Sequence, residues 1–199
     1  MKGIAALLFC LVAGCSSAMP VYHWTDKQMY SGPVVREIPI WLDKNFDQID
    51  DISISEAIAT WQYALNGYID LRIVDAKFNM EVSKINEQAK RDGWLILKIG
   101  TNSKMIPEHG SHYQAIAFAD YINGNKIFVI SSRMPFSMVK GTIMHEIGHL
   151  LGAVHSKDGL MYPHYNAYKF SCVDKNTMQQ IANRYNLNVE ILNYCLEGK

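Results

Sequence analysis

Positions 145–155 read His-Glu-Ile-Gly-His-Leu-Leu-Gly-Ala-Val-His. In an α-helix each residue turns by about 100°, so His145 and His149, four positions apart, project from one face with an offset of roughly 40°. Gly152 is the residue type that accepts the left-handed conformation in which helices end. The pattern therefore predicts a helix that ends near Gly152, after which the chain returns His155 towards the other two histidines.

Three converging imidazoles can bind one metal ion and leave a coordination position open, as catalytic zinc sites do. Glu146 is the next residue round the helix from His145. It is too short and wrongly angled to join the same coordination shell, but it can reach a water molecule held on the metal. Single histidines on a helix are usually core residues, but the joint pattern is too specific for that reading. We predict a Zn²⁺ site formed by His145, His149 and His155, with Glu146 as general base.

The chain has 199 residues, 49% of them hydrophobic, and a formal net charge of zero. This length and composition predict one domain with a sizeable core. The balanced charge gives no indication of a nucleic-acid partner. We expect a monomer that binds no nucleic acid.

The N-terminus resembles a bacterial lipoprotein signal, because the apolar run at residues 4–12 follows a basic start and precedes Cys15. The resemblance implies a signal peptide over residues 1–14, a lipid on Cys15, a lipidated N-terminus and tether over residues 15–35, and a domain over residues 36–199. An ordinary secretory signal is the alternative. About a dozen apolar residues cannot cross a bilayer, which needs roughly 20. We expect an exported protein that is lipid-anchored to a bacterial membrane, at the outer membrane or the cell surface.

Export would leave Cys172 and Cys195 as an even pair in an oxidising compartment, because Cys10 would be removed and Cys15 modified. We predict a disulfide between Cys172 and Cys195 that ties the tail across the last helix. Two buried free thiols are the alternative.

Hydrophobic periodicity predicts an α+β domain. Strands are expected at residues 37–42, 71–74, 94–99, 116–120 and 126–130. A capping box at Ser53 and Glu56 predicts the start of a helix with an apolar stripe from Ile54 to Leu65. Further helices are expected from Pro135 or Ser137 to Leu151, and from the N-cap Asp174 to Tyr185. Residues 21–36 are expected to form a tether or an arm lying on the domain, and residues 80–91 a surface helix or excursion.

The motif at 145–155, followed by Ser156 and by Leu-Met-Tyr-Pro-His-Tyr at 160–165, resembles the metzincin zinc metallopeptidases. Ser156 and the methionine at 161 make the chain similar to the matrixins, the subgroup that includes the matrix metalloproteinase catalytic domains. The order of expected elements matches that fold over about residues 36–190.

This resemblance implies a twisted mixed sheet with two helices above a cleft, and a small lower subdomain after Gly152 that carries the C-terminal helix. Met161 would form an apolar floor under the zinc ligands without binding the metal. Tyr165 would line the pocket for the residue after the scissile bond. Ala117 would contact the substrate backbone from an edge strand.

The function that the resemblance implies is a zinc-dependent endopeptidase, which hydrolyses internal bonds of a protein or peptide substrate with zinc-activated water and the Glu146 base. One alternative is a non-catalytic lipoprotein that retains zinc, and another is a zinc hydrolase acting on cell-wall peptides. Several features depart from the matrixin pattern, among them the paired acidic residues that matrixins carry in the final helix, which are missing here. We find no cysteine-bearing pro-segment ahead of residue 36, so an inhibitor partner is the alternative means of control. His109 and His112 lie where matrixins bind a second zinc, but their companion ligands are missing.

Overall fold

The computed structural model describes residues 22–78, 93–106, 116–121, 125–164 and 169–197, and has the predicted α+β class. Within these ranges there are three α-helices and a mixed five-stranded sheet. The strands are β1 (Tyr22–Trp24), β2 (Arg36–Asp43), β3 (Ile69–Phe78), β4 (Trp94–Lys98), β5 (Ala117–Asp120), β6 (Lys126–Val129) and β7 (Cys195–Glu197). The helices are α1 (Gln48–Leu65), α3 (Phe136–Leu151) and α4 (Lys175–Tyr185), with short 3-10 turns at Ser131–Arg133, Lys169–Ser171 and Val189–Ile191.

The five-stranded sheet has the order β3-β2-β4-β6-β5. The neighbours from β3 to β6 pair in parallel, whereas β5 runs antiparallel to β6 and lies at the sheet edge. Pro39 lies within β2, where it precedes by one residue the pairing with β4, which begins at Ile40. A residue without a backbone N–H is tolerated there because that side of β2 is not yet paired.

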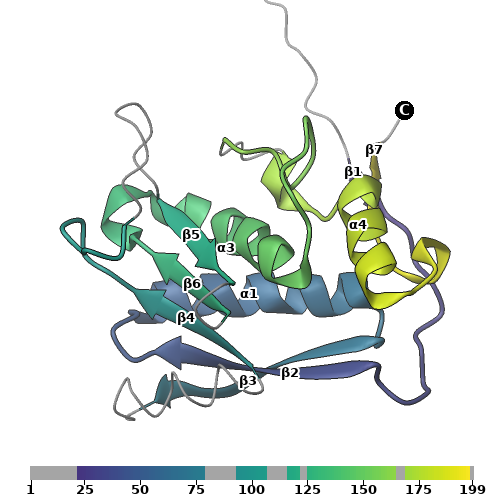
Figure 1. Ribbon diagram of the computed structural model, residues 1–199, viewed down its shortest axis with the longest axis horizontal. Helices are drawn as coiled ribbons and strands as arrows, with labels where there is room; N and C mark the ends of the chain where they lie inside the picture. The colour runs from purple at the N-terminus through teal and green to yellow at the C-terminus, as the bar shows by residue number, and fades with distance from the viewer. Residues whose placement is uncertain (1–21, 79–92, 107–115, 122–124, 165–168, 198–199) are drawn as a thin grey trace, which may run out of the picture.

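Helices α1 and α3 pack together on one face of the sheet, and α4 lies to their side next to β1 and β7 (Figure 1). The predicted apolar stripe of α1 is buried, as are Val139, Ile143, Ile147 and Leu150 of α3. Trp61 of α1 is fully buried, and its indole Nε1–H donates to the Met144 carbonyl at 2.9 Å. This bond joins the two helices directly beside the predicted metal ligands.

Helix α1 begins earlier than the capping box predicted. Asp47 is its N-cap, and the carboxylate accepts hydrogen bonds from the backbone N–H groups of Ile49 and Asp50. Ser53 lies buried inside the helix. The prediction was wrong because Asp47, six residues upstream, is as effective a cap as serine, and a helix begins at the first cap that its packing allows. Strand β3 is also longer than predicted, because it pairs with β2 along its whole length.

The two ends of the described chain meet. Strand β1 pairs antiparallel with β7, and the predicted disulfide joins Cys172 to Cys195, the first residue of β7. The first described residues thus lie as an arm on the domain. Among the described residues no helix combines the length and the apolar character needed to cross a bilayer. Residues 1–14, Cys15 and residues 80–91 lie outside the described ranges.

Candidate metal centre

Helix α3 carries three of the four predicted site residues. His145 and Glu146 are buried, with 6% and 7% of their surface exposed, and His149 is half-buried one turn further on. The helix is held by its apolar stripe against α1 and the sheet, so the direction of each site side chain follows from its position in the helix. The site is therefore built on a rigid element.

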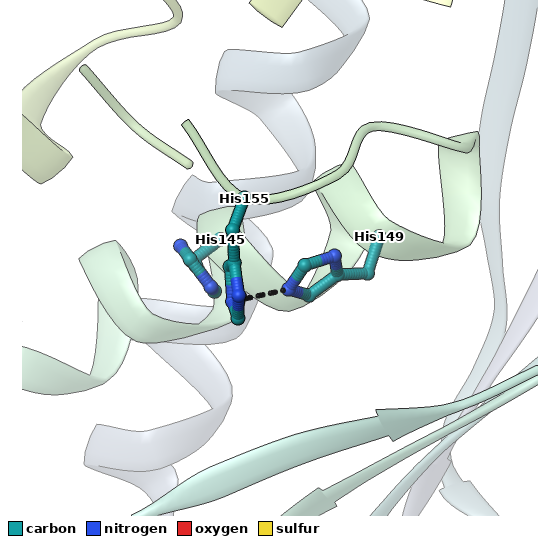
Figure 2. Close-up of side chains that lie close together, drawn as sticks. All are labelled: His145, His149 and His155. Carbon is teal, nitrogen blue, oxygen red and sulfur yellow. Dashed lines mark hydrogen bonds between the residues drawn. The ribbon is translucent and has the colours of Figure 1, made fainter. Parts of the chain in front are cut away.

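The third histidine arrives through the predicted turn. Gly152 is the C-cap of α3, with φ of 101°, and its N–H faces the carbonyls of Gly148 and His149. An L-residue strongly resists this left-handed conformation. The chain then doubles back, and the imidazole of His155 points towards those of His145 and His149 (Figure 2). All three predicted ligands are brought together.

The three imidazoles are close enough to form one metal-binding group, and the spacing of His149 and His155 matches that of two ligands of one zinc ion. One ring nitrogen from each histidine lies within 4.8 Å of the others. The Nε2 atoms of His149 and His155 are 3.2 Å apart. Two nitrogens bound tetrahedrally to zinc, each at about 2.1 Å, would be separated by about 3.4 Å. Within the described residues this is the one group of histidine, cysteine and acidic side chains that could hold a metal ion.

Two backbone carbonyls set the tautomers of the ligands. Nδ1 of His145 lies 2.7 Å from the Leu160 carbonyl, and Nδ1 of His149 lies 3.0 Å from the Ala153 carbonyl. A carbonyl oxygen only accepts, so each Nδ1 must carry the proton, and each Nε2 lone pair is directed into the site. Phe170 stacks on the His145 ring, with centroids 5.1 Å apart.

The electrostatics of the histidines favour metal binding. Burial, helped by the neighbouring His149 and His155, lowers the pKa of His145 to about 4, although the Leu160 carbonyl opposes this shift. Burial also lowers the pKa of His149 and of His155. All three rings are therefore more fully neutral at pH 7 than a free histidine, and the neutral form is the one that binds metal.

Burial shifts the pKa of Glu146 upward, in the opposite direction to the pKa values of the histidines. Burial raises its pKa to about 8, and a hydrogen bond from the Ala119 backbone pulls the pKa back down. Without a nearby positive charge the carboxyl group thus holds its proton near neutral pH. A dication bound by the histidines would favour the carboxylate, so this group is poised to exchange a proton at the site.

Strand β5 packs next to α3, beside Glu146. The Ile130 N–H donates to the Ile116 carbonyl, and the register pairs Ala117 with Val129 and Ala119 with Ile127. In an antiparallel pair, the hydrogen-bonding direction alternates along each strand, so Ala117 and Ala119 direct their backbone groups away from β6, to the open edge. The hydrogen bond between Ala119 and Glu146 agrees with this direction.

The predicted methionine floor has a specific partner. Met161 is fully buried, and a Cβ at Gly148 would come 2.5 Å from its sulfur and 3.6 Å from Trp61. The glycine of the His-Glu-Ile-Gly-His sequence is thus needed because the methionine occupies the space of a side chain. Met161 belongs to the hydrophobic core.

Sequence reasoning missed the groups that act through the backbone or arrive from distant segments. These are the carbonyls of Ala153 and Leu160, the Ala119 amide and the Phe170 ring. Backbone groups carry no sequence signal, and Phe170 gave none that separated it from core aromatics. Tyr165, His109 and His112 lie outside the described residues.

Comparison with known families finds a match to part of the chain. A family model named Metallopep and described as "Putative peptidase family" matches residues 130–193, the stretch that includes α3, the three histidines, Met161 and α4. A search of curated proteins finds no match to the chain. The family match and the convergent histidines together support a metal-dependent peptidase.

Proposed function

We propose that the protein is a zinc-dependent endopeptidase of the matrixin type within the metzincins. The observation that carries the proposal is the joint geometry of three converging histidines, a buried glutamate beside them, and an open strand edge facing that glutamate. A site that served only to hold a structural ion would usually close the fourth position with a protein ligand. It would gain nothing from burying a carboxyl group beside the metal ligands.

Zinc, when bound by His145, His149 and His155, supplies a Lewis acid that polarises the scissile carbonyl and lowers the pKa of water. The chain's own part is proton transfer. Glu146 as carboxylate accepts a proton from the attacking water and delivers it to the leaving amine. Its pKa, raised by burial to about 8, favours the first of these steps, because the protonated acid is stable near neutral pH.

The substrate would lie extended along β5. Ala117 and Ala119 direct backbone groups to the open edge, and an extended peptide can pair with such an edge irrespective of its side chains. The Ala119 amide is engaged by Glu146, which leaves the Ala117 backbone as the proposed contact for the substrate main chain. Tyr165 is proposed to line the pocket for the side chain after the scissile bond.

We further propose that the protein acts outside the cytoplasm as a monomer held to a bacterial membrane through lipid on Cys15. The disulfide between Cys172 and Cys195 supports an oxidising compartment. With the anchor at the N-terminus, the domain would meet protein or peptide substrates at the membrane surface. An inhibitor protein is proposed as the partner that controls its activity.

The test compares the wild type with Glu146→Gln, both loaded with zinc, on casein and on a library of peptides that includes cell-wall peptides. Glu146→Gln should retain zinc and lose at least about 100-fold in cleavage rate, the usual size of a general-base contribution. Glu56→Gln is the matched control, because Glu56 is an exposed residue of α1 that pairs with Lys140 on the surface.

Cleavage by Glu146→Gln at the wild-type rate would refute the role of Glu146. A wild type that binds zinc and cleaves none of the substrates would favour the non-catalytic binding module. Activity confined to cell-wall peptides would identify the alternative hydrolase.

A further inference from the structure

Asp174 makes more hydrogen bonds than a helix cap requires. As N-cap of α4, its Oδ1 accepts from the Thr177 N–H at 3.0 Å. Its Oδ2 accepts from the Thr177 hydroxyl at 2.7 Å and also from the Leu160 N–H at 2.8 Å. One carboxylate therefore joins the start of α4 to the turn that precedes Met161.

Leu160 passes this connection on to the metal centre. The same residue whose N–H binds Asp174 offers its carbonyl to Nδ1 of His145 at 2.7 Å. Leu160 is fully buried, so neither group can exchange its partner for bulk water. The orientation of its backbone is thus fixed from both sides.

The carboxylate also shapes the turn by contact. Gly159 has φ of 76°, in the left-handed region, and a Cβ at this position would overlap the Asp174 carboxylate. The turn is closed by a hydrogen bond from the Ser156 N–H to the Met161 carbonyl at 2.9 Å. Asp174 thus packs against the turn and hydrogen-bonds to it.

Asp174 itself is held from the far side. The preceding residue, Val173, accepts a hydrogen bond through its carbonyl from the Cys195 N–H at 2.8 Å, and Cys172 is bonded to Cys195. The backbone on which Asp174 sits is therefore tied to β7. The carboxylate acts from a fixed point.

We propose that Asp174 is a positioning residue for the metal ligand His145. Through Leu160 it holds the carbonyl that keeps the proton on Nδ1 and directs the Nε2 lone pair at the metal. The inference rests on the proposed metal-binding function and adds to it the residue, remote in sequence, that orients one ligand. Outer-shell partners of ligating histidines typically contribute 10–100-fold to metal affinity. Asp174 acts one residue further out, so we expect a loss of about tenfold.

The test separates the two roles of the carboxylate with Asp174→Asn. Asparagine is as good an N-cap as aspartate, so its carbonyl oxygen can still accept from Thr177. Its amide group then faces the Leu160 N–H, donor against donor, and that hydrogen bond is lost. Asp174→Ser is a second variant, because serine also caps helices but is too short to reach Leu160.

Thr177→Val is the matched control. It removes the hydroxyl that binds the same carboxylate oxygen, at a residue that is fully buried, and leaves the bond from Leu160 in place. The readout is the zinc dissociation constant, measured by competition with a chromophoric chelator in the absence of substrate. The visible spectrum of the cobalt-substituted protein reports the ligand geometry, and urea unfolding of the metal-free proteins checks the fold.

We expect zinc to bind about tenfold more weakly to Asp174→Asn and Asp174→Ser, with a changed cobalt spectrum, while Thr177→Val stays within about twofold of the wild type. Equal zinc affinity in the wild type and the folded Asp174 variants would overturn the inference. An equal loss in Thr177→Val would also overturn it, because the effect would then come from α4 as a whole. Failure of the wild type to bind zinc would instead overturn the proposed function itself.

Discussion

Helix α3 and the segment after Gly152 both supply ligands to the same centre, but different forces position them. In α3, His145 and His149 are set by helix periodicity and by an apolar stripe buried against α1 and the sheet. After Gly152 the chain has no regular structure as far as the 3-10 turn at Lys169–Ser171 in its described part, and His155 is exposed. This segment is positioned by single contacts: a left-handed glycine, a buried methionine and the hydrogen bonds of Leu160. The ligands on α3 therefore depend on helix geometry and core packing, whereas His155 depends on a few single contacts.

The difference predicts where the site is robust. Substitutions on the surface of α3 should be tolerated, because many buried contacts hold the helix in place. Single substitutions after Gly152 should reduce stability strongly, because only a few contacts hold this segment in place. The contact between Met161 and Gly148 is the place where the two regions meet.

Met161→Ala should give the largest effect. Truncating a fully buried methionine leaves a cavity under the ligands, and we expect a loss of about 4 kcal/mol in the free energy of unfolding. Urea unfolding of the metal-free protein measures it. Met161→Leu, which conserves volume, should cost less than about 1.5 kcal/mol. A small effect of the alanine variant would mean that the lower segment does not share the core of α3.

Glu146→Gln, unlike Met161→Ala, should stabilise the metal-free protein. The folded pKa of Glu146 is raised to about 8 from 4.5, so the native state holds a proton that the unfolded state releases, and wild-type stability falls as pH rises through that window. Glutamine does not titrate. The variant should match the wild type below about pH 4.5 and exceed it by about 3 kcal/mol at pH 7.

Unfolding measured at several pH values tests this expectation. If the difference in stability between the two proteins does not change with pH, burial does not raise the pKa of Glu146. Zinc should shrink the difference at pH 7, because a nearby dication favours the carboxylate. That response would show that metal binding controls the proton on Glu146, which burial alone would not do.

Gly152→Ala should give the smallest of the three effects. At φ of 101° an L-residue is strained, and the new Cβ would meet the Arg184 side chain, so we expect a loss of about 2 kcal/mol. A double-mutant cycle with Arg184→Ala separates the two causes by urea unfolding. If Arg184→Ala fully restores the stability that Gly152→Ala loses, the loss came from the clash with Arg184. The junction between the two regions then does not need a glycine for its left-handed conformation.

Much of α3 and its chemistry could be predicted from the sequence. The spacing of His145 and His149, the helix end at Gly152 and the return of His155 are consequences of local geometry, and the structure has all three. The N-cap at Asp174 and the cysteine pair were also predicted, because caps and disulfides use particular residue types. The start of α1 was wrong because two local caps competed, and only packing decided between them.

The sequence by itself determined which residues can bind a metal ion and which helix presents them, since side-chain type and helical period are written in the residue order. Only the tertiary structure decided which backbone groups orient those ligands, how Glu146 comes to hold its proton near neutral pH, and that Asp174 supports the turn before Met161. The physical reason is that every residue other than proline carries the same backbone donor and acceptor, so the choice of partner, and the burial that shifts a pKa, arise only when distant segments pack together.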